Sequence, residues 1–166
     1  MTLPTASLSF ALPDAQATTR LGEVLAGLIG PGDVLLLDGP IGSGKTHLSR
    51  ALIHAALARE GRYEDVPSPT FTLVQVYETA AFEIWHADLY RLGHPQEVIE
   101  LGLDEAMQNA VCLIEWPDRL GDLTPPGALQ LTWAAEGEGR RLTLTGPAAR
   151  LSQLAAHPEI RTLLQP

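Results

Sequence analysis

One glycine-rich segment has the spacing of a phosphate-binding loop: Gly39-Pro40-Ile41-Gly42-Ser43-Gly44-Lys45-Thr46. Glycines let consecutive backbone N–H groups turn inward around a β-phosphate, and the helix that follows adds its partial positive charge. Lys45 would bring a mobile charge to the β- and γ-phosphates, and the Thr46 hydroxyl would coordinate Mg²⁺. We therefore predict that ATP or ADP with Mg²⁺ is bound by Gly39, Ile41, Gly42, Ser43, Gly44, Lys45 and Thr46.

Lys45 is the only lysine among the 11 basic residues of the chain, the others being arginines. A compact ammonium can approach phosphate oxygens where the planar fork of arginine would not fit in the same way. The alternative, a glycine-rich turn that merely starts a helix, does not explain why lysine is kept at this position. The composition therefore favours phosphate binding.

Two acids are placed to work beside this loop. Glu115 ends the apolar run Val111–Ile114, and Asp88 ends the alternating run Phe82–Ala87. Ligands of parallel sheets bind at the carboxyl ends of the strands, so both carboxylates are expected at the edge that carries Lys45. We predict that Thr46, Glu115 and Asp88 serve the metal, Glu115 being the better candidate, and that Asp88 could instead orient the attacking water. Each acid could also be a helix cap or a solvated strand end.

The segment Ser68–Thr72 follows the phosphate-loop helix, where nucleotide switches often place a hydroxyl that senses the γ-phosphate. Thr70 is the candidate, although a proline turn entering a strand explains the pattern nearly as well. Trp116, directly after Glu115, could stack on a base, bind a partner protein or pack in the core. The five histidines lack metal-ligand spacing and are interpreted as surface or capping residues.

The expected elements form one α/β domain over residues 1–166, a P-loop NTPase-like three-layer arrangement. Val34–Leu37 and Val111–Ile114 are apolar without alternation, as in strands buried on both faces of a parallel sheet. We predict a mixed, mostly parallel sheet with helices on both faces. The further strands are expected at Ser7–Leu12, Thr70–Tyr77, Phe82–Asp88, Ala128–Ala134 and Arg141–Thr145, and the helices after Asp14, at Lys45–Gly61, from Pro95, at Leu103–Gln108 and at Ala148–Leu164 with a break at Pro158.

Composition limits the partners. The 166 residues are 45% hydrophobic and 19% charged, which suits a single domain with a real core. A net charge of −9 leaves no broad basic face, so autonomous nucleic-acid binding is not expected. The lone cysteine, Cys112, excludes an internal disulfide, and no apolar run is long enough to span a membrane. We expect a cytoplasmic protein.

Five motifs occur in order along the chain, at Asp38–Thr46, Ser68–Val74, His86–Leu92, Gly102–Glu105 and Leu113–Pro117. Together they resemble the TsaE family, ATPases of bacterial tRNA threonylcarbamoyladenosine (t6A) biosynthesis. The resemblance covers roughly residues 7 to 145, and the combination of SPTFTLV, DLYRL and IEWP is specific to that family.

The resemblance implies a weak, Mg²⁺-dependent ATPase that works with the proteins TsaD and TsaB and whose hydrolysis resets their complex between turnovers. Carried over by position, the catalytic residues are Lys45, Asp88 and Glu115, while Trp116, Thr18 and Arg141, or its neighbour Arg140, border the nucleotide. The chain departs from the family at Pro40, usually acidic, and at His47, usually threonine. The first departure puts in doubt any role for a carboxylate inside the loop.

Two other functions fit parts of the pattern. In a nucleotide-sensing interaction module, binding without hydrolysis would set the conformation, so Asp88→Asn would be harmless and Thr46→Ala would not. A small-molecule kinase shares the loop but usually has an arginine-bearing lid, and no arginine cluster occurs between residues 92 and 118. In every case the acidic chain is expected to reach tRNA only through other proteins, by salt-sensitive docking on a basic face.

Overall fold

A computed structural model describes residues 3–164. The ends of the predicted domain, residues 1–2 and 165–166, lie outside the described part. The elements are, in chain order, β1 (Thr5–Leu12), α1 (Ala15–Ala26), β2 (Val34–Asp38), α2 (Lys45–Ala58), β3 (Val74–Glu78), β4 (Glu83–Asp88), α3 (Gln96–Glu100), α4 (Leu103–Asn109), β5 (Val111–Glu115), η1 (Pro117–Leu123), β6 (Leu129–Glu136), β7 (Gly139–Pro147), α5 (Ala148–Ala156) and α6 (Pro158–Leu164).

Within the described residues the strands form one seven-stranded sheet in the order β1-β7-β6-β2-β5-β4-β3. The central strands β6, β2, β5 and β4 are mutually parallel, whereas β7 and β3 run against their neighbours. Because β1 is antiparallel to β7, it points the same way as the central strands. The predicted mixed, mostly parallel sheet is confirmed.

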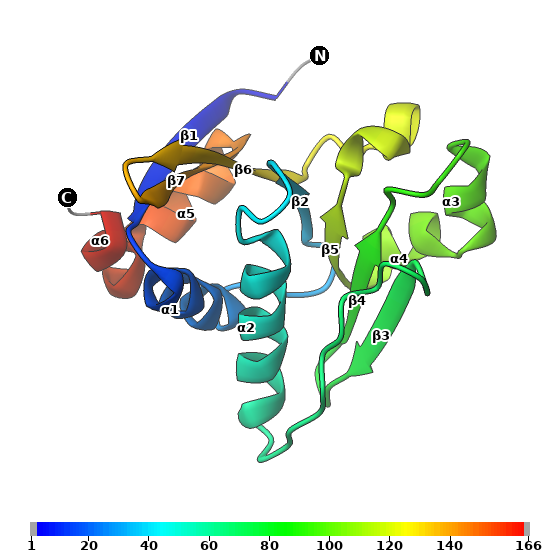
Figure 1. Cartoon of the computed structure of the whole chain (residues 1–166), viewed down its shortest axis with the longest axis horizontal. Helices are drawn as coiled ribbons and strands as arrows, with labels where there is room; N and C mark the ends of the chain where they lie inside the picture. The colour runs from blue at the N-terminus through cyan, green and yellow to red at the C-terminus, as the bar shows by residue number, and fades with distance from the viewer. Residues whose placement is uncertain (1–2, 165–166) are drawn as a thin grey trace.

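Helices cover both faces of the sheet, so the predicted three layers are confirmed (Figure 1). One core packs α1, α2, α5 and α6 against alternate residues of the strands. The other core packs α3, α4 and η1 against the opposite face. The unbroken apolar runs of β2 and β5 supply residues to both cores, which is why neither run alternates.

One predicted strand, Thr70–Tyr77, begins four residues later in the structure than the sequence suggested. Thr70–Leu73 is a turn, and β3 begins only at Val74. The Leu73 N–H donates to the Pro69 carbonyl at 2.8 Å, and Leu73 has a φ of 68°, which no strand residue adopts. The proline turn therefore overrides the β-propensity of threonine and phenylalanine here.

Pro158 and Pro117 each stand at the first position of a helix. The closing helix divides at His157 into α5 and α6, as Pro158 predicts. After Trp116 a 3₁₀ helix, η1, begins at Pro117, where only a break in the chain was expected. Trp116 itself has a φ of 59°, so the chain turns sharply at the end of β5.

Candidate functional site

The phosphate loop, Gly39–Thr46, connects β2 to α2 at the carboxyl edge of the sheet. Gly42 and Gly44 have φ values of 80° and 117°, which favour glycine. At Gly39 a Cβ would lie 2.9 Å from the Ser43 Oγ and 3.0 Å from the Trp133 Cβ, so the close approach requires glycine there too. The loop is thus shaped by residues that present backbone rather than side chains.

Lys45 lies in the first turn of α2 and is buried, with 6% of its surface exposed. Its Nζ donates to the Gly39 carbonyl at 2.7 Å, so the side chain crosses back over the phosphate loop. The same nitrogen lies 4.3 Å from the centroid of the Trp116 ring, which gives a cation–π contact. Two separate contacts therefore hold the ammonium at the mouth of the loop.

Thr46 is joined to Glu115 across the sheet edge. Its hydroxyl lies 3.0 Å from Oε1 and 3.1 Å from Oε2 of the Glu115 carboxylate. The parallel pairing of β2 with β5 places Glu115 beside Leu37, just before the loop, and so brings the two side chains together. A hydroxyl and a carboxylate oxygen side by side are hard ligands of the kind that Mg²⁺ prefers.

Glu115 has a second buried partner that the sequence interpretation missed. His86 is fully buried, which contradicts its assignment as a surface or capping residue, and its Nε2 lies 2.8 Å from Glu115 Oε2. An ionised carboxylate only accepts hydrogen bonds, so the imidazole hydrogen belongs on Nε2. The signal was available: His86 lies two residues before Asp88, and alternate strand residues share a face.

Asp88 is the register partner of Glu115 in the parallel pairing of β4 with β5. It is buried, with 7% exposed, and its Oδ1 accepts a hydrogen bond from the Tyr90 N–H at 3.0 Å. The Tyr90 ring packs against Trp116 with centroids 4.9 Å apart. Both predicted acids therefore lie at one edge, as the sequence suggested, but only Glu115 contacts Thr46.

A cavity of about 540 Å³ opens over these groups. It is lined by Ile41, Gly42, Gly44, Lys45, Thr46, His47, Ser68, Thr70, Asp88, Tyr90, Glu115 and Trp116. Thr70 is thus brought to the pocket, and its Oγ1 lies 2.8 Å from the Ser68 Oγ. Within residues 3–164 no three His, Cys, Asp or Glu side chains cluster as in a site that holds a metal by protein alone. A divalent ion here would need oxygens from the bound ligand or from water.

A second cavity, of about 310 Å³, lies on the other side of the phosphate loop. Thr18 lines it, and so does Arg140. Arg141, the arginine preferred from the sequence, does not line it: its side chain bonds Glu136 and lies 2.7 Å from the Ser9 Oγ. Neighbouring residues of β7 point to opposite sides of the strand, so only one of the two arginines can face the loop.

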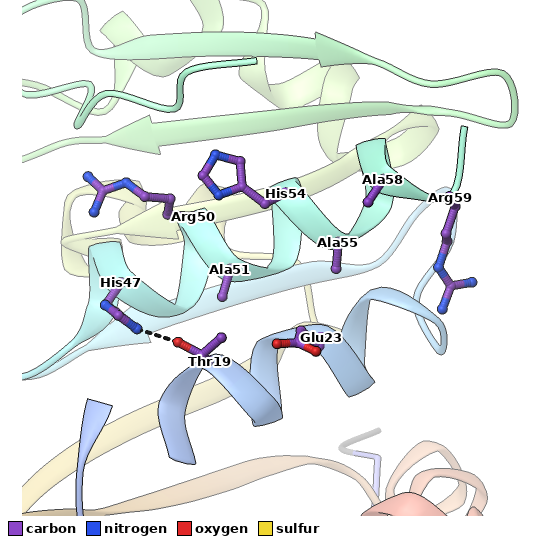
Figure 2. Close-up of a pocket in the computed structure, with 9 residues that line it drawn as sticks. All are labelled: Thr19, Glu23, His47, Arg50, Ala51, His54, Ala55, Ala58 and Arg59. Carbon is purple, nitrogen blue, oxygen red and sulfur yellow. Dashed lines mark hydrogen bonds between the residues drawn. The ribbon is translucent and has the colours of Figure 1, made fainter. Parts of the chain in front are cut away.

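The largest of these cavities, about 630 Å³, lies between α1 and α2 and contains none of the predicted site residues (Figure 2). Figure 2 shows His47, Ala51 and Ala55 of α2 directed toward α1, which carries Thr19 and Glu23, whereas Arg50 and His54 point away from α1. His47 bridges the helices, because its Nε2 lies 2.7 Å from the Thr19 Oγ1. His47, one of the two residues at which the chain departs from the pattern described above, is therefore anchored to α1.

Comparisons with known proteins agree with the motifs. The family model for threonylcarbamoyl adenosine biosynthesis protein TsaE matches residues 12–143. The chain is 35% identical over 157 residues to a TsaE protein of Rickettsia felis, covering 92% of this chain and 90% of that one. It is 32% identical over 141 residues to TsaE of Bacillus subtilis, covering 84% and 85%.

A solved structure is also similar. The crystal structure of YdiB from Bacillus subtilis superposes with a TM-score of 0.75 at 27% identity and covers 96% of this chain and 97% of that chain. No helix within residues 3–164 has both the length and the apolar character needed to cross a membrane. The family match, the relatives and the fold agree, and the chain belongs to the TsaE family of t6A biosynthesis proteins.

Proposed function

We propose that the protein binds and hydrolyses ATP with Mg²⁺ as a subunit required for t6A modification of tRNA. The observation that carries the proposal is the hydrogen bond between Thr46 and Glu115 at the start of α2. Thr46 directly follows the buried Lys45 in the chain. A loop of glycines, an ammonium, a hydroxyl and a carboxylate at one helix N-terminus are the parts that phosphoryl transfer needs.

The residues present fit a nucleotide phosphate. The Ser43 Oγ is buried and has no hydrogen-bond partner among residues 3–164, although a buried hydroxyl normally has one. The Lys45 Nζ is satisfied by a carbonyl of the loop itself, a bond that an anion could replace. Gly39, Ile41, Gly42, Ser43 and Gly44 would then surround the phosphates with Lys45 and Thr46.

The residues present also fit Mg²⁺. Thr46 and Glu115 would hold the ion, which when bound supplies charge that stabilises the phosphate oxygens. Asp88 lines the same cavity without contacting Thr46, and its carboxylate would orient the attacking water and take up its proton. The aromatic side chain of Trp116 would keep Lys45 directed toward the phosphates.

The two cavities that border the phosphate loop would hold different parts of the nucleotide. Thr70 lines the cavity beside Lys45 and would sense the γ-phosphate through its hydroxyl. Thr18 and Arg140 line the opposite cavity, where the nucleoside part would lie, and we propose Arg140 for the role first given to Arg141. The nucleotide would thus span the phosphate loop from one cavity to the other.

The proposed partners are TsaD and TsaB, whose complex would be reset by hydrolysis between turnovers. The names of the relatives support a role for this protein in t6A biosynthesis. A chain of net charge −9 would be repelled by tRNA, so it would reach tRNA only indirectly and dock by a salt-sensitive contact on a basic partner face. This work would take place in the cytoplasm, where the lone buried Cys112 stays reduced.

Phosphate release by the chain together with TsaD and TsaB tests the proposal. Lys45→Ala is expected to lower turnover by about a hundredfold or more, because the charge at the phosphates is lost. Arg59→Ala is the matched control, since it removes a cation that lines the separate cavity between α1 and α2, and it should retain turnover within about twofold. Turnover unchanged by Lys45→Ala would contradict the proposal.

A further inference from the structure

His86 is the most deeply buried titratable side chain next to the site and has no role so far. Its ring, on β4, is fully buried, and its Nε2 donates to Glu115 Oε2 at 2.8 Å. Its Nδ1 is also buried but has no partner within residues 3–164. If His86 only filled space in the core, both of its ring nitrogens would be expected to have hydrogen-bond partners. The single hydrogen bond to Glu115 therefore points to another role.

The two oxygens of the Glu115 carboxylate have different hydrogen-bond partners. Oε2 of Glu115 accepts from both His86 and Thr46, whereas Oε1 accepts from Thr46 alone. His86 cannot shift easily, because β4 pairs in parallel with β5 and places it beside Leu113, two residues before Glu115. The imidazole therefore clamps one oxygen and leaves the other available beside the Thr46 hydroxyl.

We propose that His86 is a positioning residue that holds Glu115 for a divalent cation, a role that rests on the proposed Mg²⁺-dependent function. Groups that orient metal ligands through hydrogen bonds set the affinity for the metal, typically by tenfold or more. His86 touches neither nucleotide nor metal in this scheme. It acts through the direction of one N–H bond.

The test measures metal binding rather than turnover. The chain is saturated with a non-hydrolysable ATP analogue, and the Mg²⁺ concentration that gives half of the tryptophan fluorescence change is determined. His86→Leu removes the donor, whereas His86→Gln keeps an amide N–H at a similar reach. His54→Leu is the control, because His54 lines the separate cavity between α1 and α2. Thermal unfolding of each variant reports its folding.

We expect His86→Leu to raise the half-saturating Mg²⁺ concentration about tenfold or more, and His86→Gln to stay within about threefold of the wild type. Affinity for the analogue in EDTA should be unchanged in both. Wild-type Mg²⁺ dependence in His86→Leu, or an equal loss in both variants, would overturn the role of His86 alone. A wild-type chain whose analogue binding ignores Mg²⁺ would overturn the proposed function as well.

Discussion

The ends of β4 and β5 look equivalent but have different surroundings. Asp88 and Glu115 are register partners, both acidic and both buried. Glu115 contacts the Thr46 hydroxyl and His86, whereas the hydrogen bond found for Asp88 comes from the backbone of Tyr90. A carboxylate held beside a hydroxyl suits a metal, and one held by its own chain suits a water. The position of each acid on the sheet therefore brings both to one edge, and the difference between their neighbours is the basis for the separate roles proposed for them.

The largest effect is expected at the end of β5. Glu115→Gln keeps the shape of the side chain but removes the charge that would hold Mg²⁺. Turnover in the presence of TsaD and TsaB should fall by about a thousandfold. The half-saturating Mg²⁺ concentration, measured with a non-hydrolysable ATP analogue, should rise at the same time. If Glu115→Gln had the Mg²⁺ dependence of the wild type, Glu115 would not be a ligand of the metal.

A smaller loss, of another kind, is expected at the end of β4. Asp88→Asn should lower turnover by about a hundredfold, because the water loses its proton acceptor. Binding of the ATP analogue and its Mg²⁺ dependence should stay within about threefold of the wild type. Normal t6A formation by this variant would instead favour the nucleotide-sensing module, in which hydrolysis has no role.

The aromatic residue that follows β5 should contribute less than either acid. Trp116→Ala removes the ring that lies 4.3 Å from the Lys45 Nζ, and a cation–π contact of about 0.5–1 kcal/mol corresponds to a loss of about twofold to fivefold in nucleotide affinity. Trp116→Phe keeps a ring and should lose less. Isothermal titration calorimetry compares the three proteins, and equal affinities would show that Lys45 does not depend on this ring.

The last prediction concerns stability at high pH rather than activity near neutral pH, where no effect is expected, and it tests the strand that carries Glu115. Burial raises the pKa of the Cys112 thiol from 9.0 to about 12. The unfolded chain loses this proton near pH 9 and the folded chain does not, so the stabilisation is complete below about pH 9 and is lost as the pH rises toward about 12. Between about pH 9 and pH 12, the wild-type free energy of unfolding, measured in urea titrations, should fall more steeply with pH than that of Cys112→Ala, by about 1.4 kcal/mol per pH unit. Parallel pH profiles would indicate that β5 is open to solvent.

Local sequence patterns predicted most of the fold. The apolar runs of β2 and β5, the Asp14 cap of α1 and the break at Pro158 each follow from short-range chemistry, and each is present. The segment Thr70–Leu73 was predicted wrongly because a single backbone turn at Pro69 outweighs the strand propensity of its side chains.

The site was harder to predict wherever it depends on which strands are neighbours. That Glu115 and not Asp88 contacts Thr46 follows from the pairing of β2 with β5, which local patterns do not reveal. The choice between Arg140 and Arg141 depends on which face of β7 each side chain occupies, and a shift of one residue along a strand exchanges the two faces. His86 differs from these, because its two-residue spacing from Asp88 already indicated a shared face.

The most direct test is a crystal structure with a non-hydrolysable ATP analogue and Mn²⁺ in place of Mg²⁺, located by its anomalous scattering. The metal is expected on the Thr46 Oγ1 at about 2.1 Å, with Glu115 bound directly or through one water and Asp88 beside the attacking water. Metal ligated by Asp88 while Glu115 keeps only its bonds to Thr46 and His86 would contradict the division of work between the two strand ends.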